Sequence, residues 1–566
     1  MRRRLFIALI GTIVVAIVLV VVTLQRHRPP RFPNILLISI DTCRADYLGC
    51  YGQRWNLTPN IDRFAHRATR FAEATSPVPM TLPAHCSMLT GLIPPAHGVH
   101  DNLFAHLPDS VTTLAERLKP LGYTTAAFVG AFVLDPRFGL AQGFDTYDAK
   151  FDESLTFMAG YPERRAKDVT DAALAWLQQH ADERFFLFVH YYDPHHPYRA
   201  PSPFDLKFAE HPYAAEVAYT DSEIGRLLKH IEASGLFDDA LILITADHGE
   251  GLGQHGEAVH GIFVYRSTTH VPLLIKMPRQ TSERVIDSAK VGLIDIVPTV
   301  LSVLKLEVPP DLSGKSLLPY LQGKPPPPRE RYIYSESLSG TKYGLNALFA
   351  LEGLRWKFIQ TTRPELYDLR ADPDETHDLA EQMPRNVREL RAELRARLDA
   401  TVTVHETGKT STDEETLRRL RQLGYTGGPV RIAFTFDTTR PDPKDYVKIL
   451  PEIESIDFLA QKGETEKVRR HCEALLEKGI ELPFVYASLG RAAMKEGDNE
   501  TAWEAYHKAI DKEPDRADWL NDAGVLAVRM GRPEEARTLF RRALAADPNH
   551  EKARKNLARL EERFGG

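Results

Sequence analysis

Cysteine is scarce in this chain and follows no pattern typical of a metal-thiolate site. The 566 residues contain four cysteines, Cys43, Cys50, Cys86 and Cys472. None belongs to a C-x-x-C pair or to a zinc-binding spacing, so a zinc-thiolate site is not expected. Cys43 and Cys50 are close enough in sequence to form a disulfide in an oxidising compartment, and two buried free thiols fit the sequence equally well.

An excess of charge of one sign is also lacking. The chain has 71 Lys and Arg residues against 77 Asp and Glu, a formal net charge of −6, and these residues are spread along the sequence instead of forming runs. Binding to nucleic acid requires a basic field, which this composition does not provide. We therefore expect no nucleic-acid partner.

Long apolar runs are absent except for one near the N-terminus. Residues 5–24 read LFIALIGTIVVAIVLVVVTL without a charge, and about twenty helical residues span a hydrocarbon core of roughly 30 Å. The sequence QRHRPPR follows instead of a small-x-small cleavage site, so we expect an uncleaved single-pass anchor. Arginines flank both ends, which leaves the positive-inside rule nearly tied. A short leading segment before the bulk of the chain favours a cytoplasmic N-terminus.

The central part of the chain alternates between apolar runs and helical patterns. Four runs have the length and aliphatic density of strands buried on both faces: residues 34–40, 124–129, 185–189 and 241–244. Segments 165–180 and 213–233 carry apolar residues at helical spacing. This alternation predicts an α/β fold with a mostly parallel sheet covered by helices on both faces. Asp41 follows the first run and Asp247 and His248 follow the fourth, where such folds place their ligands.

The last hundred residues contain an internal repeat. Six residues recur at an offset of 34 positions: Gly490, Gly497, Ala502, Tyr506, Ala509 and Pro514 match Gly524, Gly531, Ala536, Phe540, Ala543 and Pro548. This is the tetratricopeptide period, with small residues where two helices cross and an aromatic side chain filling the gap. Gly463 extends the register backward, which predicts three repeats, the first degenerate, and a polar capping helix over residues 551–563.

The eleven residues from Thr81 to Gly91, TLPAHCSMLTG, resemble the active-site signature of the sulfatase family of the alkaline phosphatase superfamily. That signature has Cys or Ser followed by x-P-x-R and, later, T-G. Sulfatases oxidise the Cys or Ser to formylglycine, whereas the extra methyl group of Thr81 prevents aldehyde formation and Cys86 lacks the following Pro and Arg. The resemblance therefore implies a threonine-nucleophile variant without formylglycine, in which a metal-activated hydroxyl attacks directly.

The resemblance also implies a metal site made of Asp41, Thr81, Asp247 and His248. Calcium-dependent sulfatases have a second Asp where this chain has Thr42, and commonly Asn where it has His248. Calcium prefers six to eight oxygen ligands, so the lost carboxylate and the gained imidazole favour manganese or zinc. Each residue alone has an ordinary alternative: a helix N-cap for Asp41, a turn hydroxyl for Thr81 and a solvated loop position for His248.

Two further histidines match the family pattern. His195, in HYYDPHHPY, resembles the family histidine that contacts the substrate's anionic group, and His260 lies near the position that faces the leaving group. Histidine titrates near neutrality and suits general acid catalysis there, although a loop histidine is the alternative for His260. Asp193, His255 and His260 could form a second metal site, which the spacing does not decide. His85 replaces the arginine of the signature and receives no role.

Four segments follow from these patterns: an N-terminal anchor and linker (1–31), a sulfatase-like catalytic domain (32–382), a helical connector (383–446) and a tetratricopeptide repeat domain (447–566). Because these repeats hold none of the expected metal ligands, we expect them to recruit a partner, and a chain ending near residue 440 to keep its activity on small esters.

The sequence as a whole predicts a membrane-anchored, metal-dependent hydrolase or transferase for phosphate, phosphonate or sulfate esters. Phosphoryl chemistry is favoured because the formylglycine precursor is absent. The family resemblance implies that the catalytic domain lies outside the cytoplasm at the inner membrane, where lipid headgroups or envelope glycans are expected substrates. The alternative is a catalytically inactive scaffold that binds protein partners through its repeats; the retention of all four expected metal ligands argues against it.

Overall fold

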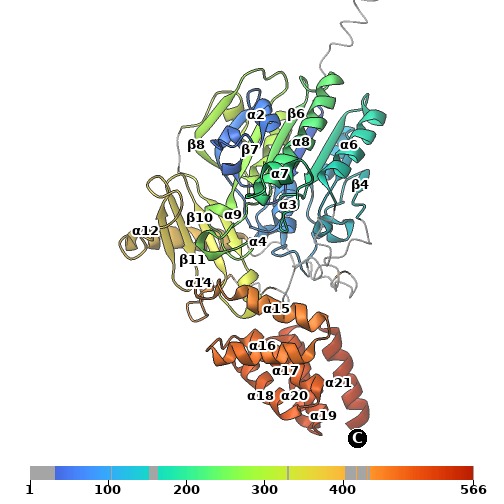
Figure 1. The fold of residues 1–566 in the computed structure, drawn as a ribbon, viewed down its shortest axis with the longest axis vertical. Coiled ribbons are helices and arrows are strands. Elements are labelled where there is room, and N and C mark those ends of the chain that lie inside the picture. Colours follow the sequence, from blue (N-terminus) through green and yellow to red (C-terminus); the bar gives the residue numbers. More distant parts are fainter. Residues whose placement is uncertain are drawn as a thin grey trace, which may run out of the picture.

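The computed structural model describes residues 32–103, 105–151, 164–327, 330–401, 416, 430 and 434–564 (Figure 1). The predicted membrane helix at residues 5–24 lies outside these ranges. Within them, the structure contains no helix with the length and apolar character needed to span a bilayer.

The larger of the two sheets has eight strands, in the order β4-β3-β5-β1-β6-β7-β2-β8. Their bounds are β1 Ile35–Ile40, β2 Thr69–Thr75, β3 Thr124–Phe128, β4 Thr146–Asp148, β5 Phe185–Tyr191, β6 Leu241–Ala246, β7 His270–Lys276 and β8 Arg284–Gly292. The four predicted strand runs correspond to β1, β3, β5 and β6. Strands β1, β5 and β6 are buried along their whole length, in agreement with their unbroken apolar sequences.

The sheet is parallel at its centre and mixed at one side. Strand β1 pairs in parallel with both β5 and β6, and Ile40 lies level with Tyr191 and Ala246. The carboxyl ends of these three strands therefore meet. Strand β7 runs antiparallel to β6 and to β2, because the chain returns from β6 through residues 247–269 without a crossover helix. Five of the seven strand pairings are parallel, so the sheet is mostly parallel, as expected, and β7 alone makes it mixed.

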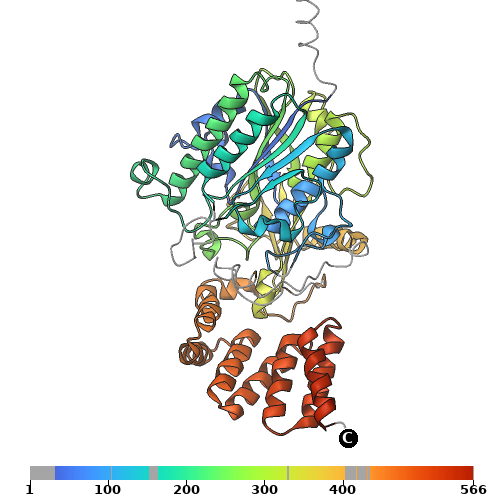
Figure 2. The same ribbon diagram turned by 90° about the vertical axis from the view of Figure 1, so that its right-hand side faces the viewer.

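Two groups of helices cover the two faces of this sheet (Figure 2). The predicted helical segments are α6 (Ala166–His180) and α8 (Pro212–Ala233), which pack against each other, and α2 (Pro59–Ala65) joins α8. On the other face, α3 (Thr81–Thr90) packs against α10 (Ile296–Val303).

The remaining short elements of this part of the chain are helices and 3-10 turns. They are η1 Ala45–Tyr47, η2 Gly49–Tyr51, α4 Pro94–His97, α5 Leu114–Leu118, η3 Lys119–Leu121, η4 Phe132–Leu134, η5 Pro136–Phe138, α7 Phe204–Lys207, η7 Gln254–Gly256, α9 Arg266–Thr269, η8 Leu293–Asp295 and α11 Leu318–Leu321.

A second, four-stranded antiparallel sheet follows in the chain. Its order is β12-β11-β10-β9, with bounds β9 Ile333–Ser337, β10 Leu348–Glu352, β11 Trp356–Gln360 and β12 Glu365–Asp368. The short helix η9 (Ser339–Tyr343) lies between β9 and β10, and α12 (Pro384–Thr401) packs against β10 and β11.

Seven helices form the C-terminal repeat region, which begins after the short α14 (Pro443–Tyr446). They are α15 Leu450–Gln461, α16 Thr465–Glu477, α17 Pro483–Glu496, α18 Asn499–Lys512, α19 Ala517–Arg529, α20 Pro533–Ala546 and α21 Glu551–Phe564. A Cβ atom on Gly490 would lie 2.9 Å from the Tyr506 ring, and one on Gly524 would lie 2.5 Å from the Phe540 ring. These contacts explain why the repeat pairs glycine with an aromatic residue.

The repeat region is not separated from the catalytic part by an open linker. One hydrophobic cluster joins Tyr343, Leu345 and Leu348 to side chains of α15, α16 and α17, among them Leu450 and Ile453. In Figure 1, α15 lies between the catalytic part and the other repeat helices. A different cluster forms the core of α17 to α21. The first, degenerate repeat thus shares its core with the catalytic part.

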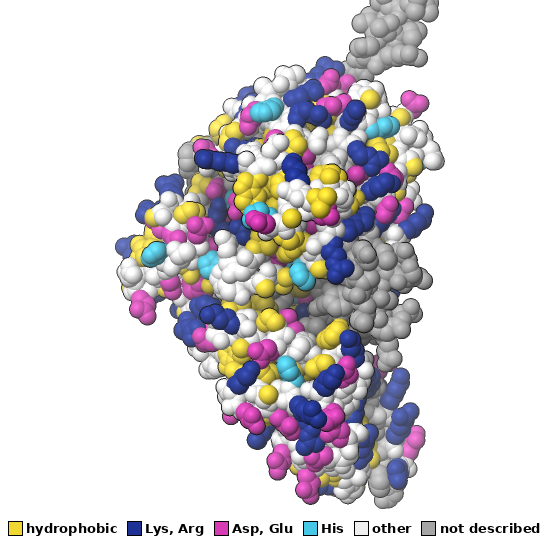
Figure 3. All heavy atoms as spheres, viewed as in Figure 1, with side chains coloured by type: hydrophobic (Ala, Val, Ile, Leu, Met, Phe, Trp, Pro, Cys, Tyr) yellow, Lys and Arg dark blue, Asp and Glu magenta, His cyan; other side chains and the backbone are white. Residues whose placement is uncertain are grey.

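The compositional expectations can be compared with the structure directly. All four cysteines are free, so Cys43 and Cys50 form no disulfide here. On the face seen in Figure 3, basic and acidic side chains are interspersed over both parts of the molecule, as the small net charge predicts.

Candidate active site

The predicted nucleophile lies in the first turn of helix α3. Met80 is extended and precedes Thr81, Pro83 fits the first turn, and Gly91 ends the helix with φ of 78°. Thr81 is fully buried. Its hydroxyl donates to Asp41 Oδ2 over 3.3 Å and lies 3.5 Å from His248 Nε2. The alternative of a turn hydroxyl does not describe this position, because Thr81 is buried within a helix and faces Asp41 and His248.

Two carboxylates extend from the carboxyl ends of neighbouring strands. Asp41 follows β1 and Asp247 follows β6, and both are fully buried. Burial raises the pKa of Asp41 to about 8, and burial together with the Asp41 charge raises the pKa of Asp247 to about 7. Asp41 Oδ1 and Asp247 Oδ2 have no hydrogen-bond partner. Two adjacent carboxylates with unpaired oxygens need a cation to compensate their charge.

His248 completes this group of possible ligands. The nearest ligand atoms of Asp41, Asp247 and His248 lie within 4.8 Å of one another. His248 Nδ1 donates to the Gly249 carbonyl over 2.9 Å, which leaves the lone pair on Nε2, 3.4 Å from Asp247 Oδ2. A metal-binding histidine commonly donates its other ring N–H in this way. The predicted residues Asp41, Thr81, Asp247 and His248 therefore fit a divalent cation.

Thr42, where the family has a second Asp, has an unusual backbone. Its φ is 51°, in the left-handed region that β-branched residues rarely adopt. Its N–H donates to Asp247 Oδ1 over 3.1 Å, and its carbonyl accepts from the Tyr213 hydroxyl over 2.7 Å. The Thr42 hydroxyl is buried without a partner. Strain of this kind is retained where the surrounding contacts require it, and here it orients Asp247.

His260 pairs with Glu250, a residue that the sequence analysis did not identify. His260 Nδ1 donates to Glu250 Oε1 over 3.0 Å, and Tyr198 donates to Glu250 Oε2 over 2.9 Å. Burial alone lowers the pKa of His260, but the Glu250 charge and hydrogen bond outweigh it and raise that pKa to about 9. Glu250 thus favours the protonated form of His260. Its ring lies 4.5 Å from that of His248, between centroids.

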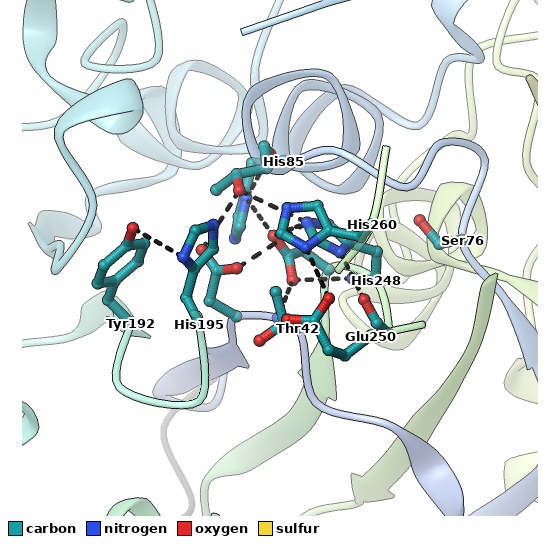
Figure 4. Close-up of polar contacts among 12 residues, drawn as sticks. Thr42, Ser76, His85, Tyr192, His195, His248, Glu250 and His260 are labelled. Carbon is teal, nitrogen blue, oxygen red and sulfur yellow. Dashed lines mark hydrogen bonds and ion pairs between the residues drawn. The ribbon is translucent and has the colours of Figure 1, made fainter. Parts of the chain in front are cut away.

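His195 also points into the site, with its ring centroid 4.9 Å from that of His260 (Figure 4). His195 Nδ1 donates to the His196 carbonyl over 2.6 Å and lies 2.9 Å from the Tyr192 hydroxyl. Its Nε2 is buried without a partner, and burial keeps the pKa of His195 well below its usual value. A neutral His195 therefore presents an acceptor at Nε2, whereas contact with an anion, as the resemblance implied, requires a donor.

His85 and His190 form a second group around Asp247, with ligand atoms within 4.8 Å. His85 Nδ1 donates to the Thr81 carbonyl over 2.7 Å, and its Nε2 accepts from Ser39 over 2.9 Å. His190 Nδ1 accepts from the Gly130 N–H over 3.3 Å, which places the proton of a neutral ring on Nε2, 3.3 Å from Asp41 Oδ2. These bonds suit holding Thr81 and Asp41 in place better than ligating a metal.

The other proposed metal group is not assembled. Asp193 accepts from the Ala166 N–H and pairs with Arg165, while His255 stacks on the Tyr265 ring at a centroid distance of 3.8 Å. Among the described residues, Asp193, His255 and His260 do not form a group of possible ligands.

Asn102 is a further residue that the sequence analysis missed. Its Oδ1 accepts from the Leu82 N–H over 2.8 Å, and its Nδ2 is fully buried without a partner. A donor is therefore available beside the first turn of α3. Glu250, three residues after Asp247, and His190, the one histidine in an aromatic and aliphatic strand, gave signals in the sequence; Asn102, in an ordinary loop segment, gave none.

Two buried aspartates and a histidine after parallel strands, with a threonine in the first turn of α3 beside them, form the kind of site found in metal-dependent hydrolases of the alkaline phosphatase type. The Sulfatase family model matches residues 33–306, and the N-sulphoglucosamine sulphohydrolase C-terminal model matches 253–403. The Tetratricopeptide repeat model matches 488–551 and 521–565.

Curated proteins and solved structures agree with these matches. The uncharacterized sulfatase YidJ of Escherichia coli (strain K12) is 25% identical over 426 residues, 62% of this chain and 84% of that protein. The multifunctional alkaline phosphatase superfamily protein PehA of Trinickia caryophylli is 27% identical over 468 residues, 61% of this chain and 91% of that protein. The phosphonate monoester hydrolase of Agrobacterium radiobacter has the same fold, with a TM-score of 0.56 at 21% identity over 65% of this chain and 96% of that one.

The chain belongs to the sulfatase family of the alkaline phosphatase superfamily and carries C-terminal tetratricopeptide repeats. It is an enzyme of a family whose matched members include sulfatases and a multifunctional alkaline phosphatase superfamily protein.

Proposed function

We propose that the chain hydrolyses or transfers a phosphate or phosphonate ester through a covalent bond to Thr81. The observation that carries this proposal is the position of the Thr81 hydroxyl, 3.3 Å from Asp41 Oδ2 and 3.5 Å from His248 Nε2 in a fully buried site. Threonine yields no formylglycine, which sulfuryl chemistry in this family requires, so phosphorus esters are favoured. Relatives of both kinds occur, a sulfatase and a phosphonate monoester hydrolase among them.

Asp41, Asp247, His248 and the Thr81 hydroxyl would hold a divalent cation. Such a cation lowers the pKa of the hydroxyl and neutralises charge on the ester oxygens. Two carboxylates and one imidazole favour manganese or zinc over calcium. Within the protein, His190 and His85 keep Asp41 and the Thr81 carbonyl in place.

The reaction itself follows from the positions of these side chains. The Thr81 hydroxyl passes its proton to Asp41 Oδ2, its hydrogen-bond acceptor, as its oxygen forms a bond to phosphorus and the bond to the leaving oxygen breaks. Glu250 holds His260 and favours its protonated form, so His260 gives a proton to the departing oxygen. The unpaired Nδ2 of Asn102, beside the first turn of α3, provides a donor for the phosphoryl oxygens. Water, or an acceptor hydroxyl in a transferase, then cleaves the phosphothreonine, and the unpaired acceptor Nε2 of His195 can take its proton.

We further propose that residues 5–24 anchor the chain in the inner membrane with the catalytic part outside the cytoplasm. The uninterrupted apolar run supports this placement. A membrane location makes lipid headgroups or envelope glycans the natural substrates, and the repeats provide a surface for a protein partner.

The test is metal analysis of the purified full chain, combined with a panel of 4-nitrophenyl esters of phosphate, phenylphosphonate and sulfate. We expect a bound transition metal, turnover of phosphorus esters, loss of turnover on chelation, and better recovery with manganese or zinc than with calcium. A metal-free protein that turns over none of the esters would support the inactive scaffold instead. Turnover of the sulfate ester alone would exclude the preference for phosphorus.

A further inference from the structure

The repeat region contacts the short helix η9, which lies between β9 and β10 of the catalytic part. Arg516, between α18 and α19, donates through Nη2 to the carbonyls of Thr341 and Lys342 over 3.3 and 3.1 Å. Tyr343 packs edge-on against Phe484 of α17 at a centroid distance of 5.2 Å. The contact is tight: a Cβ atom on Gly344 would lie 2.2 Å from Pro483.

Helix η9 contains a buried lysine, Lys342, that pairs with Asp101 close to helix α3. Lys342 Nζ donates to Asp101 Oδ1 over 3.0 Å and lies 2.9 Å from Oδ2. The two side chains are 5% and 1% exposed, so the pair is removed from water. A buried ion pair contributes little net stability but fixes the position of its partners strongly, because neither charge can be left alone.

Asp101, the partner of Lys342, is linked to Thr81 through the next residue in the chain. Asp101 precedes Asn102, whose Oδ1 accepts from the N–H of Leu82, the residue after the nucleophile. A second contact reaches the residue before it, because the Ser339 hydroxyl of η9 lies 3.2 Å from Met80 Sδ. Both sides of Thr81 are therefore held by groups that depend on η9, and η9 is held by the repeats.

We propose that Lys342 is a positioning residue for the first turn of α3, and that the repeat region keeps Lys342 in place as part of the catalytic unit. The proposal rests on the proposed role of Thr81 as nucleophile. It gives the repeats a function that recruitment of a partner does not include: they set the position of Asn102 and of the Leu82 N–H beside the reacting group.

The experiment uses the full chain with four substitutions. Lys342→Met removes the charge, Lys342→Arg retains the pairing with Asp101, and Arg516→Ala breaks the contact from the repeat side. Arg542→Ala is the matched control, because Arg542 also donates to a backbone carbonyl, that of Pro514, over 3.2 Å and lies within the repeats. The readouts are kcat and KM on 4-nitrophenyl phenylphosphonate, metal content, and hydrogen–deuterium exchange of the peptide over residues 80–90.

Small displacements of reacting groups lower rates steeply, so we expect Lys342→Met to reduce kcat by roughly tenfold to a hundredfold. KM and metal content should stay within about twofold of the parent, Lys342→Arg should restore most of the rate, and Arg516→Ala should give a smaller loss of the same kind. Both Lys342→Met and Arg516→Ala should speed exchange at residues 80–90. Arg542→Ala should change none of these quantities.

An unchanged kcat in a folded Lys342→Met protein, or equal losses in Arg516→Ala and Arg542→Ala, would overturn the proposal. If Lys342→Met does not fold, Arg516→Ala against Arg542→Ala decides the question. If the parent chain turns over no ester, the proposed function fails, and the exchange of residues 80–90 still tests the link from the repeats to Thr81: unchanged exchange in Arg516→Ala would refute it.

Discussion

The carboxyl edge of the central sheet and the C-terminal repeats bury their side chains in opposite ways. At the sheet edge, the buried groups are ionisable, and several of their polar atoms have no hydrogen-bond partner, among them Asp41 Oδ1, Asp247 Oδ2 and His195 Nε2. The core of α17 to α21 consists of small, aliphatic and aromatic side chains such as Ala502, Tyr506 and Leu520. Ionic contacts such as Arg541 with Glu561 lie on its surface.

This difference separates side chains that destabilise the fold from those that stabilise it. Buried polar atoms without partners each reduce folding stability, and a protein retains them where binding or catalysis requires them. The repeats contain a regular core and therefore stabilise neighbouring elements. The cluster shared by η9, β10 and α15 to α17 connects the two regions, so the well-packed repeats stabilise the catalytic part that contains the unpaired polar atoms.

The largest effect is expected at the sheet edge, from Thr81→Ala. Removal of the nucleophilic oxygen should lower turnover by about 10³-fold or more. Folding should be retained, because the buried hydroxyl makes only contacts of 3.3 and 3.5 Å. Thr81→Ser is the control and should keep measurable activity, since it retains the oxygen. Steady-state kinetics and circular dichroism test this directly.

Two results would contradict this assignment. Near-parental turnover by folded Thr81→Ala protein would exclude Thr81 as nucleophile. Formylglycine found at Cys86 by mass spectrometry would redirect the chemistry to that of true sulfatases.

The next largest effect should distinguish the shared core from the repeat core. Ile453→Ala and Leu520→Ala each truncate a fully buried aliphatic side chain, at a cost of about 2–5 kcal/mol. Ile453 lies in the shared cluster, so its truncation should lower the temperature at which ester hydrolysis is lost. Leu520 lies in the repeat cluster, so its truncation should mainly speed proteolysis of α19 to α21. Equal effects on thermal inactivation would show that the two clusters unfold as one.

The shared core also changes the expectation for a shortened chain. A protein ending near residue 440 would expose Tyr343, Leu345 and Leu348, which pack against α15 to α17. We now expect it to aggregate or to lose activity, instead of keeping full activity on small esters. A soluble, fully active protein of this length would show that the shared cluster is dispensable.

The sequence predicted the features that depend on local patterns. Buried strands read as apolar runs, so β1 and β6 and the aspartates that follow them were found, and the 34-residue offset located the repeats. It did not predict the contact of Lys342 with Asp101 or that of Asn102 with Leu82. Lys342 lies 241 positions from Asp101 in the sequence, and a local sequence pattern cannot predict a contact between residues so far apart. Likewise, β7 runs antiparallel because of a loop path that a single strand pattern does not reveal.

A smaller effect is expected at the metal site from His248→Asn. His248 offers Nε2 to the group that includes Asp41 and Asp247. Loss of this nitrogen should weaken manganese or zinc binding by about tenfold to a hundredfold. It should also reduce the difference between the affinity for these ions and the affinity for calcium. Metal titration monitored by restored activity measures the change, with His196→Asn as a control outside the ligand group. Full activity of the parent chain with calcium alone would contradict the expected preference for manganese or zinc.

The smallest effect is expected on the repeat side, where His550 Nε2 lies 3.0 Å from Asp518 Oδ1. The hydrogen bond to Asp518 raises the pKa of His550, and the pKa of Asp518 is lowered by that bond and the His550 charge, which outweigh its burial. Because the folded pKa of His550 is above its unfolded value, the contact stabilises the repeats fully below the unfolded pKa of about 6.5. The stabilisation is lost as pH rises through the folded pKa, while Asp518 stays ionised. The contact is partly exposed, so its contribution should be below about 1 kcal/mol. Thermal melts of the parent and of His550→Asn should therefore differ more at pH 6 than at pH 9, and a difference that is equal at both values would mean that His550 acts through packing alone.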